Sequence, residues 1–191
     1  MGKVIIGVTI SLDGFAEDRD GSVGPLYPDL EQLDASDVQQ ASIRNTGAVV
    51  MAWKEYAMAE DPDWYAGNYE YQAPIFVVGD RVPAKHPKET KELTFTYVTD
   101  GVANAIRRAK AAAGKKDVTI IGSAAMTRRS LETGLADELH LDIVPIFLKE
   151  GSRPFEAVRD LPVRLTRLRS VDLPAGRVHV EFSLTYDTAA D

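Results

Sequence analysis

The sequence predicts an α/β protein with a three-layer αβα fold and a mixed, mostly parallel eight-stranded sheet. Eight short apolar or β-branched runs are bounded by glycine, proline or aspartate, as strands commonly are. Helical patterns alternate with the earlier runs, and three strands then follow one another. Alternation favours parallel strands joined by helices, whereas consecutive strands favour an antiparallel addition. With 191 residues, the whole chain, residues 1–191, is expected to form a single domain.

The strands are identified from their periodicity and their boundaries. The first strand is rich in β-branched residues and ends at the turn pair Asp13-Gly14. The last two strands are separated by the turn sequence LPAGR. The expected strands are residues 4–12, 48–51, 75–78, 94–99, 118–121, 139–148, 163–171 and 178–186.

Three helices are expected between these strands, each ending at a glycine or just before one. They are residues 34–46, with an aspartate or serine cap, residues 102–113 and residues 123–133. Two long stretches, residues 15–33 and 57–73, have no clear periodicity. Loops longer than about 12 to 15 residues in a compact domain are often functional.

The overall composition excludes several classes of protein. There are 22 lysine and arginine residues against 29 acidic residues, so the net charge of −7 argues against a nucleic-acid-binding protein. There is no cysteine, which excludes disulfides, thiolate nucleophiles and sulfur-ligated metals. No apolar run approaches the roughly 20 residues of a membrane span, and the N-terminus reads as a strand rather than a signal peptide. We therefore expect a cytoplasmic protein without a membrane partner.

The three histidines give no sign of a metal site or of a serine triad. His86 lies in a basic, proline-flanked loop, while His140 and His179 alternate with apolar residues in strands. The strand histidines are expected to face solvent or to be hydrogen-bonded. No two of the three lie at metal-ligand spacing, so no metal is expected.

Ligands of open α/β sheets bind beyond the carboxyl ends of the parallel strands. Gly122 and Ser123 lie at such an end, where free N–H groups and the helix dipole attract phosphate, although local evidence alone favours a plain turn with Ser123 as N-cap. Asp34 and Asp37 lie where the first helix begins, and they suit either a proton relay or helix capping. The aromatic residues of WYAGNYEYQ can stack on a flat ring or pack the loop down.

Four segments carry a resemblance to a known family. They are SLDGF at 11–15, YAMAEDPDWYAGNYEYQAPIFV at 56–77, AAGKKDVTIIG at 112–122 and GLADELHLDIVPIFLKEG at 134–151. With these segments the chain resembles the dihydrofolate-reductase-like superfamily, in the branch of the reductase domain of bacterial riboflavin biosynthesis. The resemblance implies a mixed eight-stranded sheet and a homodimer. It also implies NADPH-dependent hydride transfer to a small heterocycle or carbonyl compound, such as a pterin or a ribityl-pyrimidine.

The resemblance also implies which residues form the site. Residues 12–16 would lie beside the nicotinamide, the end of the second strand would hold the 2′-phosphate and pyrophosphate, and the end of the fifth strand would hold the pyrophosphate. A proton-relay acid is expected on the first helix. The cofactor-binding residues would be Leu12, Gly14, Phe15, Ala16, Ala52, Trp53, Lys54, Glu55, Gly122, Ser123, Ala124, Ala125, Met126 and Arg128, and the catalytic acid Asp37 or Asp34.

The chain departs from the family pattern at its phosphate-binding positions. Trp53 stands where an arginine is usual, and Glu55 stands where a hydroxyl is usual. A carboxylate 4 Å from a phosphate costs about 4 kcal/mol at an effective dielectric of 20, and a lost charge-assisted contact removes roughly 1.5 to 3 kcal/mol more. We therefore expect NADPH affinity to fall a hundredfold or more, with Lys54 and Arg128 or Arg129 as partial replacements.

Two functions follow from these observations. The first is an NAD(P)H-dependent reductase with a relaxed preference between NADPH and NADH, in which Trp53 stacks on the adenine. The second is a family member with a degenerate cofactor site that serves as a small-molecule-binding protein, or as a non-redox enzyme, in the same cleft.

Overall fold

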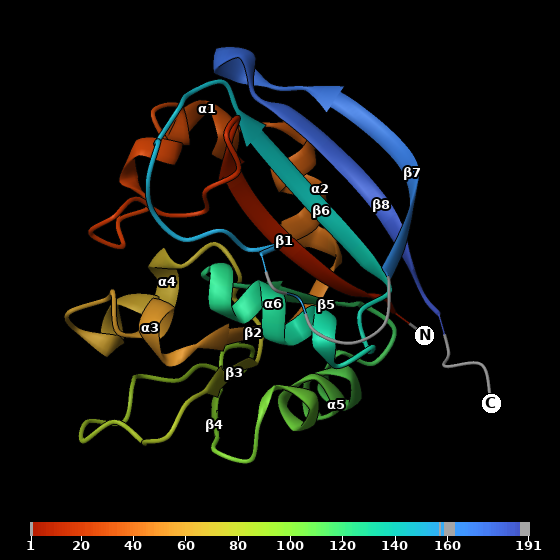
Figure 1. The fold of residues 1–191 in the computed structure, drawn as a ribbon. Coiled ribbons are helices and arrows are strands. Elements are labelled where there is room, and N and C mark those ends of the chain that lie inside the picture. Colours follow the sequence, from red (N-terminus) through yellow and green to blue (C-terminus); the bar gives the residue numbers. More distant parts are fainter. Residues whose placement is uncertain (1, 157, 159–162, 188–191) are drawn as a thin grey trace.

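The computed structural model describes residues 2–156, 158 and 163–187 and contains one eight-stranded sheet (Figure 1). The strand order is β4-β3-β2-β5-β1-β6-β8-β7. The first six strands in this order are mutually parallel, while β8 runs antiparallel to both of its neighbours. The strands are β1 (Val4–Ser11), β2 (Thr46–Ala52), β3 (Ile75–Val78), β4 (Phe95–Val98), β5 (Asp117–Ile121), β6 (Glu138–Val144), β7 (Val163–Asp172) and β8 (Val178–Tyr186). The expected fold class is confirmed.

Helices cover the two faces of the sheet (Figure 1). On one face, α5 (Val102–Ala113) and α6 (Ala124–Glu132) pack on alternate residues of β1 such as Val4 and Ile6, which are fully buried. On the other face, α2 (Asp37–Asn45) crosses the sheet without burying any residue completely. The second face is therefore only loosely covered, and this leaves room for a cavity.

Some element boundaries differ from the sequence-based expectation. The strand expected at 139–148 ends at Val144, because Pro145 has no N–H to continue the ladder and the chain turns there. The helix expected at 34–46 begins later, as α2 at Asp37, and Asp34 instead ends a separate short helix, α1 (Leu30–Asp34). Ser36 caps α2 by accepting a hydrogen bond from the Gln39 N–H.

The two long irregular stretches contain short helices that periodicity does not reveal. In residues 15–33 these are η1 (Gly24–Leu26) and the start of α1. In residues 57–73 they are η2 (Pro62–Trp64) and α4 (Tyr65–Asn68). The remaining short helices are α3 (Trp53–Tyr56) and η3 (Pro174–Gly176).

Most aromatic residues of the second stretch pack into a core of their own. Tyr56 and Tyr65 stack with ring centroids 5.5 Å apart, and Phe95 of β4 meets both rings edge-on. Tyr71 is also buried, whereas Trp64 stays 48 % exposed. The buried tyrosines of this stretch therefore pack the loop down, whereas stacking on the flat ring of a ligand stays a prediction.

Lys149 is a residue with strained backbone, since its φ angle is +70°. A left-handed conformation costs an L-residue about 1 to 2 kcal/mol, and glycine avoids most of this. We expect Lys149→Gly to stabilise the protein by about 0.5 to 1 kcal/mol, measured as a higher urea midpoint. The matched control is Glu150→Gly, which should not stabilise because Glu150 has no positive φ. Equal effects of the two changes would contradict the strain at Lys149.

Candidate functional site

A cavity of about 1060 Å³ lies between α2 and the sheet face formed by the alternate residues of β1 that do not enter the α5–α6 core. Ile5, Gly7 and Thr9 of β1 line it, together with residues of β5, β6 and β8. The loop after β1 and the aromatic segment before β3 form further walls. The cavity therefore extends along β1 and reaches the carboxyl end of β5 at Gly122 and Ser123, one of the strand ends where the sequence predicts a ligand.

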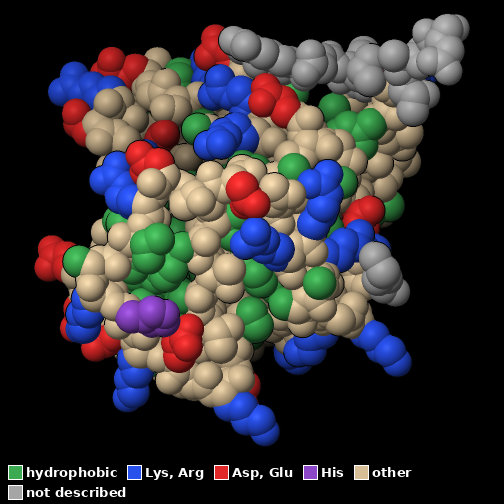
Figure 2. Space-filling model, turned by 90° about the horizontal axis from the view of Figure 1, so that it is seen from below, with side chains coloured by type: hydrophobic (Ala, Val, Ile, Leu, Met, Phe, Trp, Pro, Cys, Tyr) green, Lys and Arg blue, Asp and Glu red, His purple; other side chains and the backbone are tan. Residues whose placement is uncertain are grey.

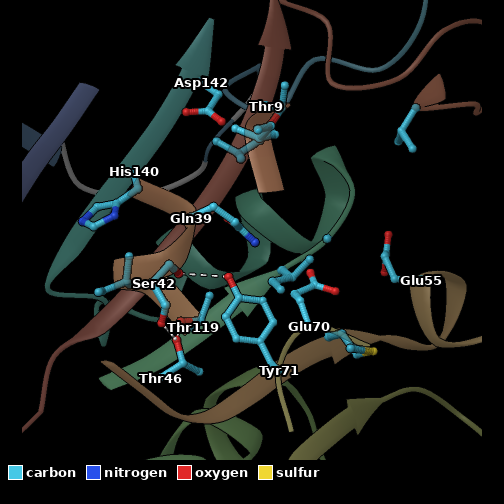
Figure 3. A pocket seen from close by; sticks show the side chains of 18 of the residues that line it. Thr9, Gln39, Ser42, Thr46, Glu55, Glu70, Tyr71, Thr119, His140 and Asp142 are labelled. Atoms are coloured by element: carbon cyan, nitrogen blue, oxygen red, sulfur yellow. Dashed lines mark hydrogen bonds between the residues drawn. The ribbon is translucent and has the colours of Figure 1, made fainter. Parts of the chain in front are cut away.

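The centre of the cavity carries uncharged hydrogen-bonding groups (Figure 3). The Tyr71 hydroxyl lies 2.9 Å from the Ser42 hydroxyl of α2. The Thr46 and Thr119 hydroxyls lie 2.6 Å apart. Gln39 of α2 projects toward the middle of the view, beside Tyr71 (Figure 3). These groups can orient a small polar ligand by donating and accepting hydrogen bonds.

Glu70 brings a carboxyl group to the same space (Figure 3). Its side chain reaches solvent through the open cavity. Desolvation by the surrounding protein nevertheless raises the pKa of this carboxyl above its ordinary 4.5, and the nearby Asp34 carboxylate raises it further. A cavity carboxyl with a raised pKa is a candidate for ligand binding or proton transfer. Sequence reasoning missed Glu70, although an acid between two tyrosines in a long loop was a usable signal.

The two predicted catalytic acids are placed differently. Asp34 ends α1, is exposed, and lines the cavity. Asp37 is the first residue of α2, is also exposed, and is not among the lining residues. Only Asp34 therefore shares the cavity with Glu70.

Glu55 occupies the expected phosphate position at the edge of the cavity. It lies in α3, directly after β2, and its Oε1 accepts a hydrogen bond of 2.8 Å from the backbone N–H of Ser123. Ser123 is the N-cap of α6, where the helix dipole favours an anion. Glu55 Oε2 is buried and has no hydrogen-bond partner among the described residues. The anion that caps α6 is thus a side chain of the protein itself.

The neighbouring residues of this edge are engaged with the protein. Trp53 packs over Gly79 at the end of β3, so closely that a Cβ on Gly79 would lie 2.9 Å from the Trp53 Cβ. Its indole also contacts the Tyr56 and Tyr97 rings. Ala52 ends β2 and does not line the cavity. Stacking of Trp53 on an adenine would require it to leave this cluster.

Two of the three cations expected to replace the missing arginine, Lys54 and Arg128, already have partners, while Arg129 is exposed. The Lys54 ammonium forms a salt bridge with Glu17, a buried acid in the loop after β1. The Arg128 guanidinium donates a hydrogen bond to the backbone carbonyl of Arg153. Arg153 in turn lies over the Phe15 ring, with its guanidinium carbon 4.0 Å from the ring centroid.

The other predicted cofactor residues are divided between cavity and core. Ala16, Gly122 and Ser123 line the cavity. Leu12 is 59 % exposed and, like Gly14 and Phe15, is not among the lining residues. On α6, Ala124 and Met126 are buried in the core beneath the helix, and Ala125 is exposed.

These contacts test whether NADPH fits as the resemblance implies. A pyrophosphate at the start of α6 would compete with Glu55 for the Ser123 N–H and would meet its carboxylate at close range. One expected counter-charge, Lys54, is bound to Glu17. With its side chains in these positions, the chain does not fit a dinucleotide phosphate at this edge.

At the far end of the cavity, β6 and β8 bring two histidines together. His140 and His179 have ring centroids 5.5 Å apart, with Glu181 beside them. Linear spacing does not reveal this cluster, because a loop and β7 separate the two histidines along the chain. The antiparallel register, which pairs His140 with Glu181 and Asp142 with His179, creates the cluster.

The fold and the cavity define the class of protein. A mixed, mostly parallel eight-stranded sheet with helices on both faces is the dihydrofolate-reductase-like fold. The chain belongs to the family of the RibD C-terminal domain, whose model matches residues 2–178. The resemblance drawn from the four sequence segments is therefore confirmed.

Solved structures share this fold at low sequence identity. A protein described as a riboflavin biosynthesis protein, from Shewanella sp. PV-4, is 18% identical with a TM-score of 0.72, over 96% of this chain and 99% of that chain. A pyrimidine reductase-like protein from Corynebacterium diphtheriae is 16% identical with a TM-score of 0.65, over 97% of this chain and 93% of that chain. A diaminohydroxyphosphoribosylaminopyrimidine deaminase/5-amino-6-(5-phosphoribosylamino)uracil reductase from Thermotoga maritima is 13% identical with a TM-score of 0.68. That match covers 96% of this chain and 57% of the Thermotoga chain. A comparison of the sequence with curated proteins found no match.

Two further observations concern the helices and the charges on the surface. In the part of the chain that the structure describes, no helix is both long enough and apolar enough to cross a membrane. On the face shown in Figure 2, basic and acidic side chains are interspersed rather than gathered by sign.

Proposed function

We propose that this protein binds a small planar heterocycle of the pyrimidine or pterin kind in the cavity beside α2. We further propose that it does not bind the dinucleotide cofactor of its family. The observation that carries the proposal is the hydrogen bond from the Ser123 N–H to Glu55, since the resemblance implies a cofactor phosphate at this N-terminus of α6. The cavity itself is retained. Under this proposal the protein binds a ligand, or carries out non-redox chemistry, in the cavity of a reductase-like fold.

The chemistry of the cavity supports this class of ligand. Glu70 offers two acceptor oxygens, and the Gln39 amide offers both a donor and an acceptor. Ring N–H and amino groups of a pyrimidine can pair with a carboxylate, while carbonyl groups can pair with an amide. Apolar side chains such as Leu33, Val38 and Ile121 line the same cavity and suit the faces of a flat ring.

The second candidate is an NAD(P)H-dependent reductase that transfers a hydride to such a ligand or to a carbonyl compound. Family membership supports it. A structural observation also favours it: Glu55 makes one hydrogen bond, and its second oxygen has no partner among the described residues, so the side chain is held weakly. If Glu55 moves away, the N-terminus of α6 becomes free for a phosphate.

Calorimetric titration of the purified protein separates the two candidates. The proposal expects no binding of NADPH or NADH at millimolar concentration, together with measurable binding of a diaminopyrimidine or a pterin. Micromolar NADPH binding that weakens with salt, with oxidation of NADPH in the presence of the heterocycle, would establish the reductase instead.

Glu70→Gln tests the place of the heterocycle. An ionised Glu70 accepts hydrogen bonds from ring N–H groups, so Glu70→Gln should weaken the diaminopyrimidine about tenfold or more. Because the pKa of Glu70 lies above its ordinary value of 4.5, wild-type affinity should rise with pH as Glu70 ionises, and this rise should disappear in the variant. The control is Glu92→Gln, which changes an exposed acid outside the cavity. Equal affinities in the two variants would place the ligand elsewhere.

A further inference from the structure

We propose that His140, His179 and Glu181 form a binding site for a divalent transition-metal ion of the zinc type at the β6–β8 end of the cavity. The residues offer one ligand atom each, and these atoms lie within 4.8 Å of one another. Two imidazoles and one carboxylate form a ligand set that zinc prefers.

The strands position the three side chains on one face of the sheet. His140 lies on β6, and His179 and Glu181 lie two residues apart on β8, so the β8 pair projects to one side. The register pairs His140 directly with Glu181. All three residues line the cavity, which gives an ion a route from solvent.

The distances suit a metal with little rearrangement. His179 Nε2 lies 3.3 Å from Glu181 Oε1, and His140 Nδ1 lies 4.0 Å from the same oxygen. Neighbouring ligands of a tetrahedral zinc are roughly 3.3 Å apart, given bonds of about 2.0 to 2.1 Å. A small movement of the His140 ring therefore completes the three-ligand side of a tetrahedron.

The opposite nitrogen of each ring is already held by a carboxylate. His179 Nδ1 lies 2.7 Å from Asp142 Oδ1, and His140 Nε2 lies 3.0 Å from Glu138 Oε2. Metal-binding histidines usually have such a partner, because it orients the ring and makes the free nitrogen a better ligand. Both free nitrogens here face Glu181.

Three protein ligands leave a fourth position on the metal. Zinc sites of this kind commonly bind water or substrate there, whereas purely structural sites use four protein ligands. A cavity ligand bearing an oxygen or nitrogen donor can occupy that position. Such a site adds a Lewis acid to the cavity, a chemistry that the proposed function does not require.

One contact competes with the metal. Arg169 of β7 forms a salt bridge with Glu181, in which its Nη2 lies 2.7 Å from Oε1, the same atom that would bind the ion. A purely structural network of charges would need this arginine, whereas a metal site would bind its ion more tightly without it. The arginine therefore distinguishes the two interpretations.

Equilibrium dialysis against zinc chloride, with the absorption spectrum of the cobalt form as a second readout, tests the proposal. We expect one zinc per chain at micromolar or lower dissociation constant. His140→Gln and Glu181→Gln should each weaken zinc binding about a hundredfold, and Asp142→Asn should weaken it about 10- to 100-fold. Arg169→Gln should strengthen it. The matched control is His86→Gln, which removes the exposed histidine outside the cluster and should leave zinc binding unchanged.

Because His179 is buried, the partly exposed His140 carries the main test, and thermal melting of each metal-free variant shows whether it folds. The proposal is overturned if the wild-type protein retains no zinc. It is equally overturned if folded His140→Gln binds zinc as the wild type does, or if His86→Gln loses it to the same degree.

Discussion

Glu55→Thr is expected to increase the affinity for NADPH about a hundredfold. The change frees the Ser123 N–H at the start of α6 and restores a hydroxyl where the family has one. It also removes a carboxylate, which 4 Å from a phosphate costs about 4 kcal/mol at an effective dielectric of 20. Even half of that energy, about 2 kcal/mol, corresponds to roughly thirtyfold in the dissociation constant, and the freed N–H adds to it.

Two further variants separate charge from shape in this experiment. Glu55→Gln keeps an oxygen that can accept from Ser123 but loses the charge, so its gain should be smaller than that of Glu55→Thr. Glu92→Thr makes the same change of net charge at an exposed position outside the cavity and should leave NADPH affinity unchanged. If Glu55→Thr gains no more than Glu92→Thr, the carboxylate of Glu55 is not what excludes the dinucleotide.

Arg177→Met is expected to destabilise the protein by about 3 to 5 kcal/mol, because it leaves the buried Asp29 carboxylate without its counter-charge. Arg177 is 0% exposed, and its Nη2 and Nε lie 2.6 and 3.0 Å from the two oxygens of Asp29. Nη2 also donates to the Leu26 carbonyl. The pair holds η1 and α1 against the end of β8, and residues of both short helices line the cavity. Urea unfolding measures the loss.

The effect of this variant should depend on pH. Hydrogen bonding and charge from Arg177 lower the pKa of Asp29 below its ordinary 3.8, against the opposing effect of burial. A lowered folded-state pKa adds stability that is present above pH 3.8 and is lost as pH falls through the folded value. The difference between wild type and Arg177→Met should therefore be fully present at pH 7 and shrink as the pH falls below 3.8.

An exposed arginine–aspartate pair supplies the control. Arg164 pairs with Asp187 through contacts of 3.1 Å, but its side chain is 76% exposed. Arg164→Met should cost at most about 1 kcal/mol, because solvent screens such pairs. A similar loss in both variants would contradict the role assigned to the buried pair.

Some features of the site could be predicted from local sequence alone. Apolar periodicity and turn residues determined the strands and main helices, since each depends on neighbours a few positions away. The positions of Glu55 and Gly122-Ser123 at strand ends also determined that both lie at the ligand-binding edge of a parallel sheet. A weakened phosphate site is predicted from AWKEY and GSAAM and stays a prediction. Homodimerisation stays a prediction.

Only the tertiary structure decided what these residues contact. Glu55 and Ser123 are 68 positions apart, and Arg177 and Asp29 are 148 apart. His140 faces Glu181, two residues from His179, only because β8 lies between β6 and β7 in one particular register. A strand register shifted by one residue would turn one strand's side chains to the other face, so no linear spacing encodes such a cluster. The sequence by itself determined the fold and the edge of the sheet at which a cleft is expected. Packing across the sheet decided which charged side chains line that cleft.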